Sequence, residues 1–127
     1  MNESGTLRIF RKILLVGFVV AIALTIWFSL IPIDYIPSAT RFSDLVLHFF
    51  GYAVLGFLAV ASGLHWRTGF VVVFTLGVLL ELVQGFLGYR YFEIKDIVVN
   101  GLGTAVGVGI GSLFVVEFFT TYRYRHR

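Results

Sequence analysis

Four acidic or imidazole side chains stand out in a chain that carries few charges. Asp44 and His48 lie one helical turn apart, Glu81 is the single ionisable residue of the apolar run 69–88, and Asp96 precedes another apolar run. Ionisable residues are rare within membrane-spanning segments and usually mark functional sites. Carboxylates and imidazoles hold Mg²⁺, Mn²⁺ or Zn²⁺, and a histidine oriented by an aspartate can act as a general base. These four are therefore the candidate catalytic residues. No cofactor is predicted outright, and a divalent metal ion is the one that such side chains would accept.

Each of these residues also has a purely structural interpretation. An aspartate at the start of a helix, such as Asp44 or Asp96, is commonly an N-cap. A protonated Glu81 can make an interhelical hydrogen bond and have no further role. Three carboxylates and a histidine at one place are harder to explain by packing alone, which favours a functional site.

The composition indicates the solvent in which these side chains lie. The 127 residues are 58% hydrophobic and 13% charged, with a mean hydropathy of +0.93, whereas a soluble domain carries about 25% charged residues. A helix of about 20 residues crosses the ~30 Å hydrocarbon core of a bilayer. We therefore expect an all-α integral membrane four-helix bundle that forms a single domain over residues 1–127. Its predicted spans are residues 13–31, 45–64, 69–88 and 97–119.

The basic residues predict how this bundle is oriented. With the N-terminus inside, the inner segments hold seven Lys and Arg residues and the outer segments hold three. Lys and Arg in short loops stay on the cytoplasmic side, so both termini are expected in the cytoplasm and the loops 32–44 and 89–96 outside. The basic tail 122–127 suits an anionic lipid surface and is too short to indicate a nucleic-acid partner. The absence of cysteine excludes disulfides, thiolate metal sites and cysteine nucleophiles.

Small and polar residues recur every three or four positions along each predicted span, which gives each helix one polar face. The polar ends of all four faces fall in the predicted outer half of the membrane. We therefore predict one outward-opening pocket, with Glu81 near its floor and Arg41, Arg90 and Lys95 at its rim. The residues predicted to bind a ligand there are Ser29, Asp44, His48, Tyr52, Glu81, Gln84, Arg90, Asp96 and Asn100.

Glycines continue the polar face of the last span beyond Asn100. Gly103, Gly107 and Gly111 form two consecutive small-xxx-small motifs. Such residues let helix backbones approach closely in lipid, so these glycines are predicted to pack helices rather than to bind a ligand.

Four short motifs, taken in order, resemble the VanZ-like family of membrane proteins. They are "SLIP" (29–32), "DLVLHFFGY" (44–52), "ELVQGFLGYR" (81–90) and "DIVVNGLGTAVG" (96–107). The resemblance implies that the characteristic positions of the family include Ser29, Pro32, Asp44, His48, Tyr52, Glu81, Gln84, Arg90, Asp96, Asn100, Gly103 and Gly107. The chain departs from the family at Leu45, where many members have lysine, so one basic residue is missing from the pocket mouth. The namesake of the family is linked to low-level resistance to the glycopeptide teicoplanin, and the resemblance implies a multi-pass protein of the bacterial cytoplasmic membrane.

Three functions are compatible with the predicted pocket. The first is the binding or handling of a membrane lipid or a lipid-linked cell-wall precursor, because Arg and Lys at the rim match phosphate and carboxylate groups. The second is an intramembrane hydrolase or transferase that uses the four candidate catalytic residues. The third is a component of a proton-linked transporter with Glu81 as the proton carrier, which would require a homo-oligomer because four helices are few for transport. We expect the first, and the resemblance adds an effect on glycopeptide susceptibility.

Overall fold

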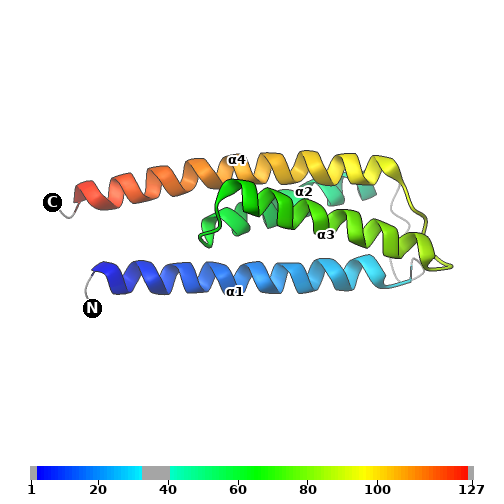
Figure 1. Cartoon of the computed structure of the whole chain (residues 1–127), viewed down its shortest axis with the longest axis horizontal. Helices are drawn as coiled ribbons and strands as arrows, with labels where there is room; N and C mark the ends of the chain where they lie inside the picture. The colour runs from blue at the N-terminus through cyan, green and yellow to red at the C-terminus, as the bar shows by residue number, and fades with distance from the viewer. Residues whose placement is uncertain (1–2, 33–40, 126–127) are drawn as a thin grey trace.

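The computed structural model describes residues 3–32 and 41–125, which form four long α-helices (Figure 1). The helices are α1 (Glu3–Leu30), α2 (Arg41–Ala61), α3 (Trp66–Phe86) and α4 (Ile94–Arg125). Each is long and apolar enough to cross a membrane. The prediction of an all-α bundle with four spanning helices is therefore confirmed over the described residues, while the orientation of the termini across the membrane stays a prediction.

The helices alternate in direction, so that both chain ends lie at one end of the bundle (Figure 1). The first turns of α2 and α4 and the last turns of α1 and α3 lie at the opposite end. Near the chain ends, α1 and α4 extend beyond the turn between α2 and α3. There the rings of Phe10 and Phe118 stack at 5.1 Å, and the Arg11 guanidinium lies 4.8 Å from the ring centroid of Phe119. The 32 residues of α4 correspond to ~48 Å, which is longer than the hydrocarbon core.

The turn between α2 and α3 is specified by its glycine. Gly63 has a φ of 116°, a left-handed conformation that a residue with a Cβ rarely adopts. The Leu64 amide donates to the Ala59 carbonyl at 3.1 Å and the Gly63 amide to the Val60 carbonyl at 3.0 Å. This pair of bonds is a Schellman motif, which satisfies the last carbonyls of a helix. The predicted span 45–64 therefore runs past the end of α2, which stops at Ala61.

The packing of α2 against α4 is the most extensive helix contact in the described chain. The glycines Gly103, Gly107 and Gly111 of α4 all face α2 at this contact. A Cβ added at Gly107 would collide with the Ala53 carbonyl oxygen, and one added at Gly56 of α2 would lie 2.7 Å from a carbonyl oxygen of α4. The two backbones thus approach each other at positions where one of the two helices has a glycine, as small-residue motifs permit in membranes.

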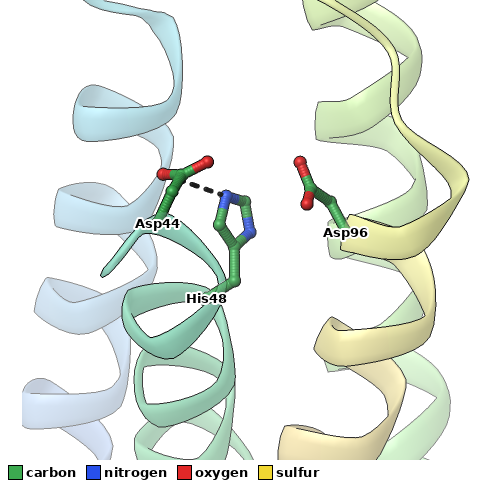
Figure 2. A group of neighbouring side chains, drawn as sticks. All are labelled: Asp44, His48 and Asp96. Atoms are coloured by element: carbon green, nitrogen blue, oxygen red, sulfur yellow. Dashed lines mark ion pairs between the residues drawn. The ribbon is translucent and has the colours of Figure 1, made fainter. Parts of the chain in front are cut away.

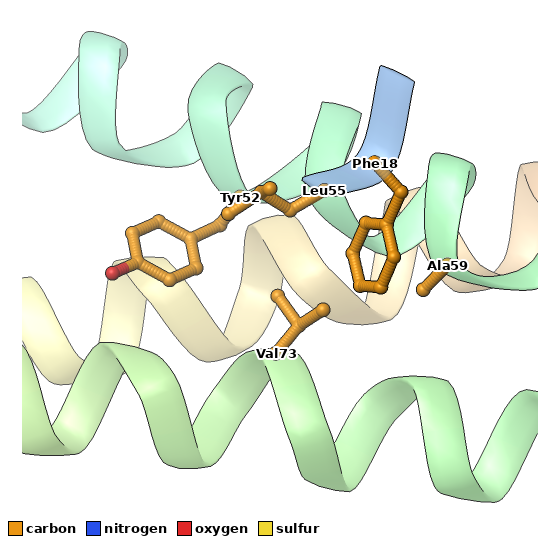
Figure 3. Close-up of a cluster of buried hydrophobic side chains, with 5 residues drawn as sticks. All are labelled: Phe18, Tyr52, Leu55, Ala59 and Val73. Atoms are coloured by element: carbon orange, nitrogen blue, oxygen red, sulfur yellow. The ribbon is translucent and has the colours of Figure 1, made fainter. Parts of the chain in front are cut away.

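The apolar core lies between α1, α2 and α3 (Figure 3). Its buried members are Phe18, Tyr52, Leu55, Ala59 and Val73. Many other large apolar side chains point outward, particularly along α1, as expected for a surface that meets lipid rather than water. The core therefore holds the helices in register and leaves one end of the bundle to polar residues.

Candidate functional site

A pocket of about 120 Å³ opens at the end of the bundle where α2 and α4 begin and α3 ends. Its lining comes from these three helix ends and from the segment that joins α3 to α4. The lining residues are Asp44, Leu45, His48, Gln84, Arg90, Tyr91, Glu93, Lys95 and Asp96. Several of the polar residues that the sequence placed at one depth thus meet at one end of the bundle, and Leu45 is among the lining residues.

The orientation of the His48 ring in this pocket is fixed by a hydrogen bond to α4. Its Nδ1 donates to the Oδ1 of Asn100 on α4 at 2.9 Å, so that in the neutral ring Nε2 is the nitrogen that can accept. Nε2 lies 3.8 Å from the Oδ1 of Asp44, one turn earlier on α2. The amide of Asn100 is itself buried, and Gly77 of α3 provides its space: a Cβ there would lie 3.3 Å from the Asn100 Nδ2 atom. A neutral imidazole in this tautomer can act as a general base or as a metal ligand.

Asp96 faces this histidine from the first turn of α4. Figure 2 shows its carboxylate turned toward Asp44 and His48 across the space between α2 and α4. The residue is only 6% exposed, and its Oδ1 atom has no hydrogen-bond partner among the described residues. Asp44, His48 and Asp96 each offer one ligand atom, and the three atoms lie within 4.8 Å of one another. An N-cap would instead accept a backbone hydrogen bond through its carboxylate.

Glu81 is not one of the residues that line the pocket, although it interacts electrostatically with His48 and Asp96. It is 1% exposed, and it does not belong to the cluster of potential ligands within the described chain. Its Oε2 atom accepts a hydrogen bond from the Glu93 backbone amide at 3.3 Å. The reason is the path of the segment between α3 and α4, which folds back and lays its own backbone over Glu81.

Arg90 and Gln84 contact α1 rather than a carboxylate. The Arg90 guanidinium donates to the carbonyls of Phe28 at 3.1 Å and Ile31 at 3.0 Å, and the Gln84 amide donates to the Ser29 carbonyl at 2.9 Å. The last carbonyls of a helix have no partner within the helix, so cationic and amide donors stabilise them. The sequence placed Arg90 at the rim of the pocket; in the structure its guanidinium also holds the end of α1 to this end of the bundle.

The remaining predicted residues support the pocket or fall outside the description. Tyr52 is buried in the apolar core, with its ring parallel to that of His48 at 6.5 Å. Ser29 contributes its backbone carbonyl to Gln84. Lys95 lies at the rim and forms an ion pair with Glu93, in which its Nζ atom is 2.9 Å from the Glu93 Oε2 atom. The side chain of Arg41 lies outside the described part of the chain.

Three residues of this site had no place in the sequence-based prediction. Tyr91 and Glu93 line the pocket, and the Tyr89 hydroxyl donates to the Leu30 carbonyl at 2.7 Å. A signal for Glu93 was present, because it precedes Asp96 by three residues and so lies close to it at the start of α4. No comparable signal existed for the two tyrosines, whose positions depend on the path of the loop.

Over the described residues, fold and pocket together define a class of protein: a four-helix bundle of the membrane with a polar, largely acidic pocket at one end. The model of the VanZ/LLP1 family matches residues 15–115, a segment that contains every predicted site residue. The chain therefore belongs to the VanZ/LLP1 family. No curated protein and no solved structure matches the sequence.

Proposed function

We propose that this protein binds the polar head group of an anionic envelope lipid, either a lipid-linked cell-wall precursor or a phospholipid, in the pocket between α2, α3 and α4. One observation carries the proposal. A pocket lined by charged and amide side chains is set into the end of a bundle whose outer surface is apolar. An amphiphile presents the complementary combination of a polar head and an apolar chain.

The side chains at the mouth are suited to contact both the polar head group and the apolar chain of such a ligand. Lys95, which pairs with Glu93, and Arg90, which binds carbonyls of α1, both line the pocket, and cationic groups of this kind also bind phosphate or carboxylate oxygens. Gln84 can hydrogen-bond to hydroxyl or amide groups of a head group. The exposed apolar residues Phe86 and Ile94 lie at the same end of the bundle, where the start of an acyl or isoprenyl chain would contact them.

The cellular setting of this proposal follows from the charge distribution. With both termini in the cytoplasm, the pocket opens toward the outer side of a bacterial cytoplasmic membrane. Lipid-linked cell-wall precursors are used on that side. Binding them would change how much precursor a glycopeptide antibiotic can reach, which is the route by which this protein would affect susceptibility.

Retention of lipid by the purified protein tests the proposal. Native mass spectrometry of gently purified wild-type protein is expected to show one bound phosphate-bearing lipid. Lys95→Gln is expected to reduce its retention about tenfold, as the loss of a charge-assisted hydrogen bond of ~1.4 kcal/mol would. Lys12→Gln is the matched control, because Lys12 is exposed near the opposite end of the bundle. Equal retention by the two variants, or no retained lipid in the wild type, would refute the proposal.

A second function, catalysis on such a lipid, is supported by the orientation of His48. Its Nδ1 is held by Asn100, and its Nε2 faces Asp44 and the pocket, which is the arrangement of a general base. Incubation of the protein with its co-purified lipid separates the two functions. A change in lipid mass with time that His48→Gln abolishes would favour a hydrolase or transferase, whereas an unchanged lipid favours binding alone.

A further inference from the structure

We propose that Asp44, His48 and Asp96 bind one divalent first-row metal ion, such as Zn²⁺, in the pocket. The site would use the Nε2 atom of His48 and one carboxylate oxygen from each aspartate. It stands independently of whether a lipid occupies the rest of the pocket.

The spacing of the three ligand atoms supports a common ion. All three lie within 4.8 Å of one another, and the His48 Nε2 atom lies 3.8 Å from the Asp44 Oδ1 atom. Ligand atoms that share a tetrahedral ion at about 2.1 Å lie roughly 3.4 Å apart. Small rotations of the aspartate side chains close the difference, and Asp44 is free to move because its side chain is 49% exposed at the mouth.

The hydrogen bond on the far side of the imidazole supports the same role. Ligating histidines usually donate their second ring N–H to a carbonyl or carboxylate, which fixes the tautomer and the ring orientation. His48 has this arrangement, because its Nδ1 donates to the Asn100 side-chain carbonyl at 2.9 Å and its Nε2 lies 3.8 Å from the Asp44 carboxylate (Figure 2). A histidine that served only to pack the helices would not require its second nitrogen to face a carboxylate.

Asp96 provides the second independent observation. A carboxylate that is 6% exposed and has an oxygen without a hydrogen-bond partner among the described residues is costly to bury unless a cation faces it. The nearby protein cations are engaged elsewhere: Lys95 pairs with Glu93, and Arg90 binds the carbonyls at the end of α1. With both aspartates ionised and the histidine neutral, the three side chains carry a charge of −2, which a divalent ion balances.

The donor set indicates the kind of ion. Mg²⁺, Ca²⁺ and Mn²⁺ prefer oxygen ligands, whereas an imidazole nitrogen favours Zn²⁺ and its neighbours Fe²⁺, Ni²⁺ and Cu²⁺. Three protein ligands leave coordination positions open toward the pocket, as in catalytic zinc sites. A phosphate or carboxylate oxygen of a ligand, or water, would fill these positions.

A Co²⁺ titration of the detergent-purified, EDTA-treated full-length protein tests the site. The absorption bands of tetrahedral or five-coordinate Co²⁺ are expected to saturate at one ion per chain, and Zn²⁺ is expected to abolish them at equal concentration. A hundredfold excess of Mg²⁺ should leave them unchanged. Failure of Co²⁺ and Zn²⁺ to bind the wild-type protein, or full displacement by Mg²⁺, would overturn the proposal.

Variants show which residues hold the ion. Asp96→Asn and His48→Gln are each expected to weaken Co²⁺ binding by at least about a hundredfold, and Asn100→Ala, which removes the partner of the imidazole, by about 10- to 100-fold. Glu117→Gln, at the other end of α4, is expected to bind as the wild type does. Unchanged binding by both Asp96→Asn and His48→Gln, with thermal unfolding like that of the wild type, would also overturn the assignment. If one of the two fails to fold, the other decides.

Discussion

Replacing Gly107 with alanine perturbs the closest contact between α2 and α4. A Cβ at Gly107 would collide with the Ala53 carbonyl oxygen, which belongs to the backbone and cannot rotate away. Gly109 lies two residues further along the same helix, and a Cβ there would have nothing within 4 Å. Both substitutions gain the same helix propensity, about 1 kcal/mol. The difference in the free energy of unfolding between the two variants therefore isolates the collision.

The size of this difference follows from the packing. Adding a methyl group to a closely packed contact costs about 1–3 kcal/mol when the surroundings must shift. Gly109→Ala is thus expected to be as stable as the wild type or up to ~1 kcal/mol more stable. The free energy of unfolding of Gly107→Ala is expected to be ~1–3 kcal/mol lower than that of Gly109→Ala. At about 4 °C per kcal/mol for a chain of this size, the unfolding midpoints should differ by about 4–12 °C.

Circular dichroism during heating in the same detergent measures both midpoints. Equal midpoints for the two alanine variants would refute the close backbone contact, and with it the basis on which the site is assembled. A large loss of stability in Gly109→Ala alone would show that this face of α4, which is exposed here, is covered by another surface in the membrane.

Two further pairs of substitutions test Glu81 and the orientation of the chain. Glu81→Gln keeps an oxygen that can accept from the Glu93 amide, so its free energy of unfolding should change by less than about 1 kcal/mol, whereas Glu81→Leu leaves that amide unpaired and should lose about 1–3 kcal/mol. Chemical unfolding in mixed micelles measures both free energies. Equal losses in the two variants would show that this hydrogen bond does not stabilise the buried position of Glu81. Because the chain has no cysteine, single cysteines can report topology: an impermeant thiol reagent should label Gly88→Cys and not Thr68→Cys on intact cells. The reverse labelling would mean that the pocket opens to the cytoplasm.

The sequence predicted the end of the bundle at which the polar residues meet, because helical periodicity and alternating helix direction are both readable from residue spacing. His48 and Asp96 were placed together on that basis alone. The roles of Glu81 and Arg90 were not predictable in this way. Glu81 bonds to the Glu93 backbone and Arg90 to the carbonyls at the end of α1. Both partners are backbone atoms, whose positions depend on how the chain leaves a helix, and side-chain patterns carry no record of that path.

The glycines and the polar residues of the motif 96–107 both depend on how closely α4 approaches α2. Phe49, whose carbonyl oxygen a Cβ at Gly103 would strike, follows His48 directly on α2. Asn100, which bonds to His48 at 2.9 Å, lies one turn before Gly103 on α4. A side chain at Gly103 would push the two helices apart at this level, and a hydrogen bond weakens rapidly beyond about 3.2 Å. The closeness of α2 and α4 is therefore a condition for the His48–Asn100 pair as much as for packing. Asp96, one turn further toward the pocket, is brought opposite His48 by the same approach of the two backbones.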